Sequence, residues 1–191
     1  MVEPAHSTFI LGGQRSGKSR WAELLSRDWL AAAPVHRAVM IATGQACDEE
    51  MRERIARHQS DRADRVPGMV TVEEPRALVD ALRRHSDPQT LVIVDCLTLW
   101  LTNLMMPAAT AQVLPEADVL AAGEALCDAI ATATGPVVLV GNEIGLGVIP
   151  MGSEVRAFVD TLGRLNQRVA ASCQRVTLMA AGLPLTLKDE T

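Results

Sequence analysis

One octapeptide constrains the fold of this chain more than any other feature. It reads Gly12-Gly13-Gln14-Arg15-Ser16-Gly17-Lys18-Ser19 and matches the pattern G-x-x-x-x-G-K-S/T at every defined position. An apolar run at residues 9–11 precedes it, and a helical pattern at residues 21–30 follows it. This order predicts a buried strand, a phosphate-binding loop, and a helix whose N-terminus faces the phosphates.

The residue types in this loop suit a nucleoside triphosphate. Glycines let consecutive backbone N–H groups turn toward phosphate oxygens. Lys18 can reach the β- and γ-phosphates, and the Ser19 hydroxyl can ligate Mg²⁺. The alternative is a glycine-rich turn that contains a lysine by chance. Only Lys18 and Lys188 are lysines among eighteen basic residues, so chance is a weak explanation, and we predict nucleotide binding by residues 12–19.

Short apolar runs alternate with helical patterns along the whole chain. We predict strands at residues 8–11, 38–42, 69–72, 91–94, 137–140 and 176–180, and helices at residues 18–32, 48–59, 75–84, 97–105, 116–132 and 153–172. Two strands, 91–94 and 137–140, are continuously apolar, as expected of strands buried on both faces of a parallel sheet. The pattern predicts an α/β fold with a mostly parallel sheet flanked by helices, in one domain over residues 1–191.

Three irregular stretches, residues 60–68, 107–115 and 141–152, are predicted loops, where functional residues tend to lie. The apolar stretch 91–109 is interrupted by Asp95 and by other polar residues, so we expect a strand followed by a helix and no membrane span.

Composition excludes several classes of protein. Hydrophobic residues make up 48% and charged residues 21%, which is ordinary for a globular domain and excludes disorder. Three Trp, two Phe and no Tyr argue against a base-stacking platform, and a net charge of −5 argues against a broad phosphate-backbone surface. We therefore predict no nucleic-acid partner.

The four cysteines point to a reducing compartment. They are Cys47, Cys96, Cys127 and Cys173, with no C-x-x-C pair and no histidine at zinc-finger spacing. We expect free thiols, with neither a disulfide framework nor a zinc site. The first seven residues are not basic, so no signal peptide is expected, and we predict a cytoplasmic protein.

Asp95 closes the apolar run 91–94. A P-loop site needs a carboxylate at the end of a neighbouring strand to hold Mg²⁺, and Asp95 has this Walker-B-like placement. A strand-terminal aspartate that caps the next helix is the alternative, and both roles can coexist. We favour the metal role, with Ser19 as the second metal residue.

Residues 48–58 predict a helix whose acidic first turn agrees with the helix dipole. Met51, Ile55 and His58 fall at i, i+4 and i+7, so the histidine shares the inward stripe. Several arginines lie close in sequence, at Arg54, Arg57, Arg62 and Arg65. On these residues alone, a half-buried histidine beside solvated arginines is the simpler interpretation. The alternative is a nucleophilic imidazole whose neighbouring arginines hold a nucleotide's phosphates.

Several motifs point together to one family. They are residues 12–19, 41–45, 48–58, 94–98, 101–104, 141–150 and 163–168. In this order they resemble the bifunctional adenosylcobinamide kinase/adenosylcobinamide-phosphate guanylyltransferase family, the CobU/CobP type. The phosphate loop is shared by many families, whereas the N-E-I-G-x-G-x-x-P block and the R-I-x-x-H helix are far more specific. The resemblance covers almost the whole chain.

The resemblance implies a RecA-like P-loop fold and two activities in assembling the nucleotide loop of cobalamin. One phosphorylates the aminopropanol hydroxyl of adenosylcobinamide with ATP or GTP. The other transfers GMP from GTP to that phosphate through a covalent histidine–GMP intermediate, giving adenosylcobinamide-GDP. The matching histidine is His58. The resemblance also implies a homo-oligomer such as a trimer, and further nucleotide contacts at Ala42, Thr43, Gly44, Gln59, Ser60, Asp61, Arg62, Glu73 and Asp95.

One segment departs from the family pattern. The family usually reads H-R-x-x-R-P, whereas this chain reads His58-Gln59-Ser60-Asp61-Arg62-Ala63, and Pro67 comes later. The first arginine is missing, and Arg65 is a candidate substitute.

Three alternatives to the bifunctional transferase remain at this point. They are a kinase of the same fold without guanylyl transfer, a GTP-dependent switch, and a subunit of a ring-forming ATPase. A Ras-like switch would carry N/T-K-x-D, and neither lysine lies in such a motif.

Overall fold

The computed structural model describes residues 6–46, 49–107 and 111–190, and within these ranges seven strands form one sheet. The strand order is β3-β2-β4-β5-β1-β6-β7. The strands are β1 (Ser7–Gly12), β2 (Arg37–Ala42), β3 (Met69–Glu73), β4 (Thr90–Asp95), β5 (Val137–Val140), β6 (Arg175–Ala180) and β7 (Leu183–Asp189). Every pairing is parallel except that of β6 with β7. The mostly parallel α/β fold is therefore confirmed, and each predicted strand lies within an observed one.

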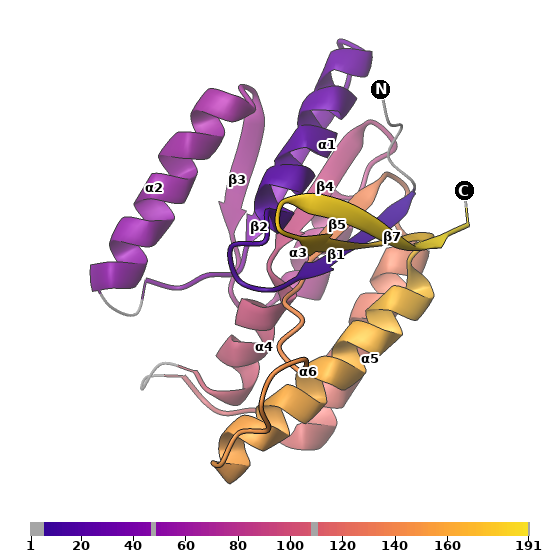
Figure 1. The fold of residues 1–191 in the computed structure, drawn as a ribbon. Helices are drawn as coiled ribbons and strands as arrows, with labels where there is room; N and C mark the ends of the chain where they lie inside the picture. The colour runs from indigo at the N-terminus through magenta and orange to yellow at the C-terminus, as the bar shows by residue number, and fades with distance from the viewer. Residues whose placement is uncertain (1–5, 47–48, 108–110, 191) are drawn as a thin grey trace.

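Helices cover both faces of the sheet (Figure 1). They are α1 (Lys18–Ala32), α2 (Glu49–Arg65), α3 (Leu78–His85), α4 (Leu97–Met105), α5 (Glu116–Ala131) and α6 (Ser153–Ser172). One apolar core joins Ala22 and Leu25 of α1 to strand residues such as Ile10 and Ile93. On the other face, a larger apolar core packs the helices α3, α4, α5 and α6 against the sheet. In Figure 1, α2 lies at the edge of the molecule beside β3.

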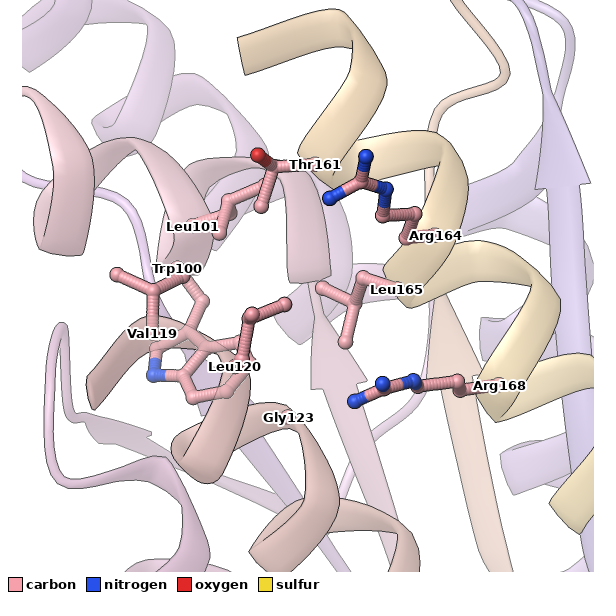
Figure 2. Close-up of a pocket in the computed structure, with 9 residues that line it drawn as sticks. All are labelled: Trp100, Leu101, Val119, Leu120, Gly123, Thr161, Arg164, Leu165 and Arg168. Carbon is pink, nitrogen blue, oxygen red and sulfur yellow. The ribbon is translucent and has the colours of Figure 1, made fainter. Parts of the chain in front are cut away.

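In the larger core, helices α4, α5 and α6 pack against one another as well as against the sheet. Figure 2 shows the small pocket between these helices, where Trp100 and Leu101 lie across from Leu165, and Arg164 and Arg168 lie on either side of Leu165. Gly123 of α5 faces Leu165 of α6, and a Cβ at this glycine would lie 3.4 Å from the Leu165 side chain, at ordinary contact distance. At the surface, Arg168 pairs with Glu124 at 3.1 Å across the same two helices. No helix among the described residues has the length and apolar character needed to cross a bilayer.

Strand β7 was not predicted from the sequence. Its leucines, Leu183, Leu185 and Leu187, are exposed at an edge of the sheet, and Pro184 lies among them, so the segment lacks the buried apolar run of the other strands. A two-residue turn reverses the chain after β6, so that residues 183–189 pair with β6 as an antiparallel strand. Ala181 and Gly182 have φ of 52° and 80°, the left-handed pair that suits a tight antiparallel hairpin.

Two helix boundaries differ from the prediction by more than one residue. The helix predicted over 48–59 continues to Arg65, so residues 60–65 are helical and not loop. Its predicted first residue, Asp48, lies outside the described residues. Pro75 was predicted to begin a helix, but α3 begins at Leu78, because the Glu74 carboxylate accepts hydrogen bonds from the N–H groups of Arg76 and Ala77 and holds a turn there.

Candidate functional site

The carboxyl ends of five parallel strands open onto one groove, the position at which open α/β sheets bind ligands. Its lining residues come from the phosphate loop, α1, α2 and the segments after β2, β3, β4 and β5. They are Gln14, Arg15, Ser16, Gly17, Lys18, Ser19, Arg20, Glu23, Ala42, Gly44, Gln59, Asp61, Arg62, Arg65, Glu73, Asp95, Cys96, Leu99, Val140, Asn142 and Ile144.

Most of the predicted nucleotide residues therefore share one cavity. Four do not line it. Gly12 ends β1, Gly13 follows it, Thr43 is fully buried, and Ser60 lies exposed on α2. The backbone of His58 lies within α2, whereas its side chain is outside the described part of the structure.

The phosphate loop depends on glycine where the backbone turns. Gly12 has φ of 152°, and a Cβ there would lie 2.5 Å from the Met179 carbonyl oxygen of β6. Gly17 has φ of 99° and precedes the first residue of α1 without a side-chain cap. The first N–H groups of α1 are consequently left for an anion. The β6–β7 turn supports the loop from behind, because Gly182 N donates to Ser16 O at 3.1 Å.

Lys18 lies in this loop with little exposure to solvent. Its Nζ donates to the Gly13 carbonyl oxygen at 2.5 Å, within the loop itself. Burial lowers the pKa of Lys18, and the acidic groups of Cys96 and Asp95 partly offset that shift. An anionic ligand in the groove would supply the counter-charge that this buried ammonium lacks.

Thr43 fixes the backbone that follows Asp95. Its hydroxyl donates to the Cys96 carbonyl oxygen at 2.7 Å and accepts from the Cys96 N–H at 2.9 Å. The Thr43 N–H donates to the Asp95 carbonyl oxygen at 3.1 Å. The Asp95 side chain therefore faces the groove from a backbone held on both sides, and Thr43 itself is a support beneath the groove.

Asn103 joins this support to the next loop. Its buried Nδ2 donates to the carbonyl oxygens of Thr43 at 2.7 Å and Pro75 at 3.0 Å. Replacing Asn103 by leucine leaves both carbonyls without this donor, so we expect a loss of about 2–3 kcal/mol in the free energy of unfolding. Thermal denaturation should show a fall in Tm of about 5–10 °C.

The control is Thr102→Val on the same helix. The Thr102 hydroxyl donates only to the Thr98 carbonyl oxygen within α4, at 2.9 Å, so its removal should change Tm little. Equal Tm values for the two variants would contradict the role given to Asn103.

The segment after β5 is tied to the phosphate loop, as Glu143 N donates to Gly12 O at 3.2 Å. Asn142 N donates to the Thr98 hydroxyl at 2.9 Å, and Asn166 Nδ2 donates to Asn142 O at 3.1 Å. Asn142 and Ile144 line the groove, although the predicted nucleotide residues did not include them. Their place at the end of β5, between β1 and β4, was the available signal.

The wall contributed by α2 is held by polar side chains. Gln59 Nε2 donates to Glu73 Oε1 at 3.1 Å, which joins two predicted nucleotide residues. Arg62 is buried and donates to the Thr71 hydroxyl at 3.2 Å, and Arg65 donates to Glu23 at 2.9 Å. Glu23 was absent from the predicted site, because nothing in the local sequence pairs it with a helix some forty residues later.

Cys96 lies in the groove beside Asp95, and burial raises the pKa of its thiol from 9.0 to about 11. At pH 8 the thiolate fraction is about a hundredfold lower than for an unshifted thiol, so iodoacetamide should modify Cys96 slowly. The rate should rise about tenfold per pH unit up to that pKa. Mass spectrometry of the cysteine peptides measures the modification rate of Cys96, with the partly exposed Cys127 as the reference. Equal modification rates of the two cysteines at pH 8 would contradict the raised pKa of Cys96.

Among the cysteines that the structure describes, Cys96, Cys127 and Cys173 are free thiols, as predicted. Cys47 lies outside the described residues.

Comparison with known proteins gives a family match over nearly the whole chain. The model of the family described as "Cobinamide kinase / cobinamide phosphate guanyltransferase" matches residues 8–187. The chain is 45% identical over 181 residues to the bifunctional adenosylcobalamin biosynthesis protein CobP of Pseudomonas aeruginosa, covering 95% of this chain and 96% of that protein. It is 33% identical over 186 residues to the bifunctional adenosylcobalamin biosynthesis protein CobU of Escherichia coli, covering 94% and 98%.

Solved structures of low sequence identity share the fold. The flagellar accessory protein FlaH of Methanocaldococcus jannaschii has a TM-score of 0.55 at 12% identity, covering 97% of this chain and 80% of that one. A second solved structure, an ATPase domain, has a TM-score of 0.55 at 9% identity, covering 96% and 77%. The predicted RecA-like P-loop fold is thus confirmed.

Proposed function

This chain belongs to the cobinamide kinase/cobinamide phosphate guanyltransferase family, and from that premise we propose that it performs both reactions in cobalamin biosynthesis. Its substrates are then adenosylcobinamide, its phosphate, GTP and, as an alternative phosphate donor, ATP. The observation that carries the proposal is the single groove. It brings together residues of the phosphate loop, Asp95 of β4, Glu73 of β3 and the α2 segment that follows His58.

In the first reaction, the aminopropanol hydroxyl of adenosylcobinamide attacks the γ-phosphorus of the triphosphate, and the nucleoside diphosphate leaves. The phosphate loop binds the β- and γ-phosphates, and Lys18 exchanges its contact with Gly13 O for phosphate oxygens. Asp95 lies at the end of β4, two strands from β1, where it faces the same phosphates. Most of the catalysis in such a transfer is positioning and charge stabilisation.

In the second reaction, a neutral His58 imidazole attacks the α-phosphorus of GTP, and pyrophosphate leaves. The phosphate of adenosylcobinamide phosphate then attacks the guanylylated histidine, forming adenosylcobinamide-GDP and restoring the imidazole. Covalent catalysis divides one difficult displacement into two easier ones. Arg62 and Arg65, which line the groove from α2, the helix that carries His58, are suited to hold the charge of the departing pyrophosphate.

Magnesium fits the donors that this chain offers. Ser19 and Asp95 contribute oxygen ligands to one groove, and Mg²⁺ usually takes one or two protein ligands together with phosphates and water. Within the described residues no group of three or more His, Cys, Asp or Glu side chains could hold a metal ion, so phosphates and water would complete the coordination. When bound, Mg²⁺ neutralises the charge that develops on the transferring phosphoryl group.

The test uses the purified protein with Mg²⁺ and GTP labelled at the α-phosphate or at the γ-phosphate. Acid-labile, base-stable α-label on the protein supports the histidine intermediate. Transfer of γ-label to cobinamide supports the kinase, and mass spectrometry identifies adenosylcobinamide-GDP as the final product. Transfer of γ-label without α-label would favour the kinase alternative, and no cobinamide-dependent turnover of either label would overturn the whole proposal.

A further inference from the structure

Glu23 is a buried carboxylate that neither proposed reaction uses. It lies on α1, five residues after Lys18, and its side chain is only 4% exposed while still lining the groove. A carboxylate withdrawn from water in this way is unfavourable unless charged groups or hydrogen bonds compensate it. The groups that compensate the buried Glu23 carboxylate therefore indicate the role of this residue.

Both compensating cations come from α2. Arg65 Nη1 donates to one Glu23 oxygen at 2.9 Å, and Arg62 Nε lies 4.0 Å from the other. The second guanidinium nitrogen of Arg65 pairs with Asp61 at 2.9 Å. Arg62 Nε is buried without a hydrogen-bond partner in the described structure, so Glu23 is the charge that compensates it. The hydrogen bond with Glu23 also raises the pKa of Arg65 above its ordinary value.

Among the side chains that the structure describes, α2 is joined to its neighbours by a few polar contacts. Figure 1 shows α2 at the edge of the sheet, beside β3. Within the described side chains, α2 is tied to β3 by Gln59–Glu73 and Arg62–Thr71, and to α1 by the Glu23 contacts. Glu23 therefore links α2 directly to the helix that begins at the phosphate loop.

The link falls on the helical stripe to which His58 belongs. Arg62 follows position 58 by four residues and Arg65 follows it by seven, the spacing that returns to one side of a helix. Any rotation of α2 about its axis would therefore turn position 58 together with the two arginines. Fixing Arg62 and Arg65 on α1 fixes the rotation of that stripe relative to Lys18.

We propose that Glu23 is a positioning residue for guanylyl transfer, holding α2 through Arg65 and Arg62 so that His58 is presented to the nucleotide bound at the phosphate loop. The inference rests on the proposed function, because it assigns Glu23 to the histidine-dependent reaction alone. Phosphoryl transfer needs the phosphate loop and Asp95, which β1 and β4 hold independently of α2.

The first test compares Glu23→Gln with wild type in two single-turnover rates. Guanylylation, followed by α-label on the protein, should fall about 10- to 100-fold, as expected for a misplaced nucleophile. Transfer of γ-label to cobinamide should fall much less, and the KM for GTP in that reaction should change little. The control is Glu124→Gln, which removes a carboxylate from the Arg168 pair far from the groove and should leave both rates unchanged.

The second test asks whether Glu23 and Arg65 act as a pair. In a double-mutant cycle, the variant with both Glu23→Gln and Arg65→Gln should guanylylate no more slowly than the slower single variant. Additive losses would mean that the two side chains act separately and would overturn the proposal. Equal proportional losses of guanylylation and phosphoryl transfer in Glu23→Gln would also overturn it.

A third readout needs no activity. Hydrogen exchange at residues 49–65 should quicken by about tenfold in Glu23→Gln because α2 loses its link to α1, while α5 and α6 keep their protection. Unchanged exchange there would overturn the proposal. Absence of α-label on the wild-type protein would instead refute the guanylyl transfer itself, and exchange would still decide whether Glu23 holds α2.

Discussion

Replacing Lys18 by alanine is expected to remove both activities together, lowering kcat/KM about a thousandfold for each. Lys18 is the ammonium buried within the phosphate loop, and both proposed reactions use a triphosphate whose β- and γ-phosphates this loop would bind. Nucleotide binding measured by calorimetry should weaken in parallel with turnover. Lys18→Arg should not restore the rates, because the longer planar guanidinium does not fit a loop shaped around an ammonium.

The chain supplies its own control for this experiment. Lys188 is the other lysine, and its ammonium donates to the carbonyl oxygens of Ala171 and Cys173 beside β7. Lys188→Ala should leave turnover unchanged and affect only stability. If Lys18→Ala kept more than about a tenth of the wild-type rate, the assignment of the loop to the triphosphate would be wrong.

Replacing His58 by alanine is expected to separate the two reactions. Guanylylation should fall by roughly 10⁴-fold or more because the nucleophile is gone, while transfer of γ-label to cobinamide continues at a rate within a few-fold of wild type. The product should then accumulate as adenosylcobinamide phosphate, which mass spectrometry distinguishes from adenosylcobinamide-GDP.

His85→Ala is the matched histidine control. His85 is the last residue of α3 and precedes the start of β4. It therefore lies toward the amino ends of the parallel strands, whereas the groove lies at their carboxyl ends. Both activities should survive this change. Persistent α-label on the His58→Ala protein would place the covalent intermediate on another residue, and peptide mapping of the label would identify it.

The central strands could be predicted because their local sequence carries enough information. Residues 91–94 and 137–140 are continuous apolar runs, and both are fully buried strands of the sheet. Strand β7 escaped prediction because it is held by pairing with β6 at an exposed edge and not by burial of its own leucines. The last turn of α2, which was predicted as loop, contacts a partner distant in sequence, the carboxylate of Glu23.

The residues of the candidate site also fall into two groups, those that the local sequence predicts and those that only the fold brings together. The phosphate loop and Asp95 could be found from contiguous motifs, and the structure brings residues 14–19 and Asp95 to one groove. Thr43 was expected at the nucleotide by resemblance, and the structure places it beneath the groove, where its hydroxyl holds the Cys96 backbone. Glu23 and Arg65 meet across forty-two residues of sequence, and no local spacing signals such a pair.

The contact between Gly182 and Ser16 has a consequence for the order in which this protein matures on the ribosome. The loop that follows β1 is completed by the β6–β7 hairpin, which is translated after the other strands that the structure describes, and β1 itself lies between β5 and β6. A nascent chain that ends before residue 175 would lack β6, one of the two neighbours of β1, and also the hydrogen bond from Gly182. Such a chain should bind triphosphate poorly, so the emerging polypeptide should acquire nucleotide affinity only after the β6–β7 hairpin has left the ribosome.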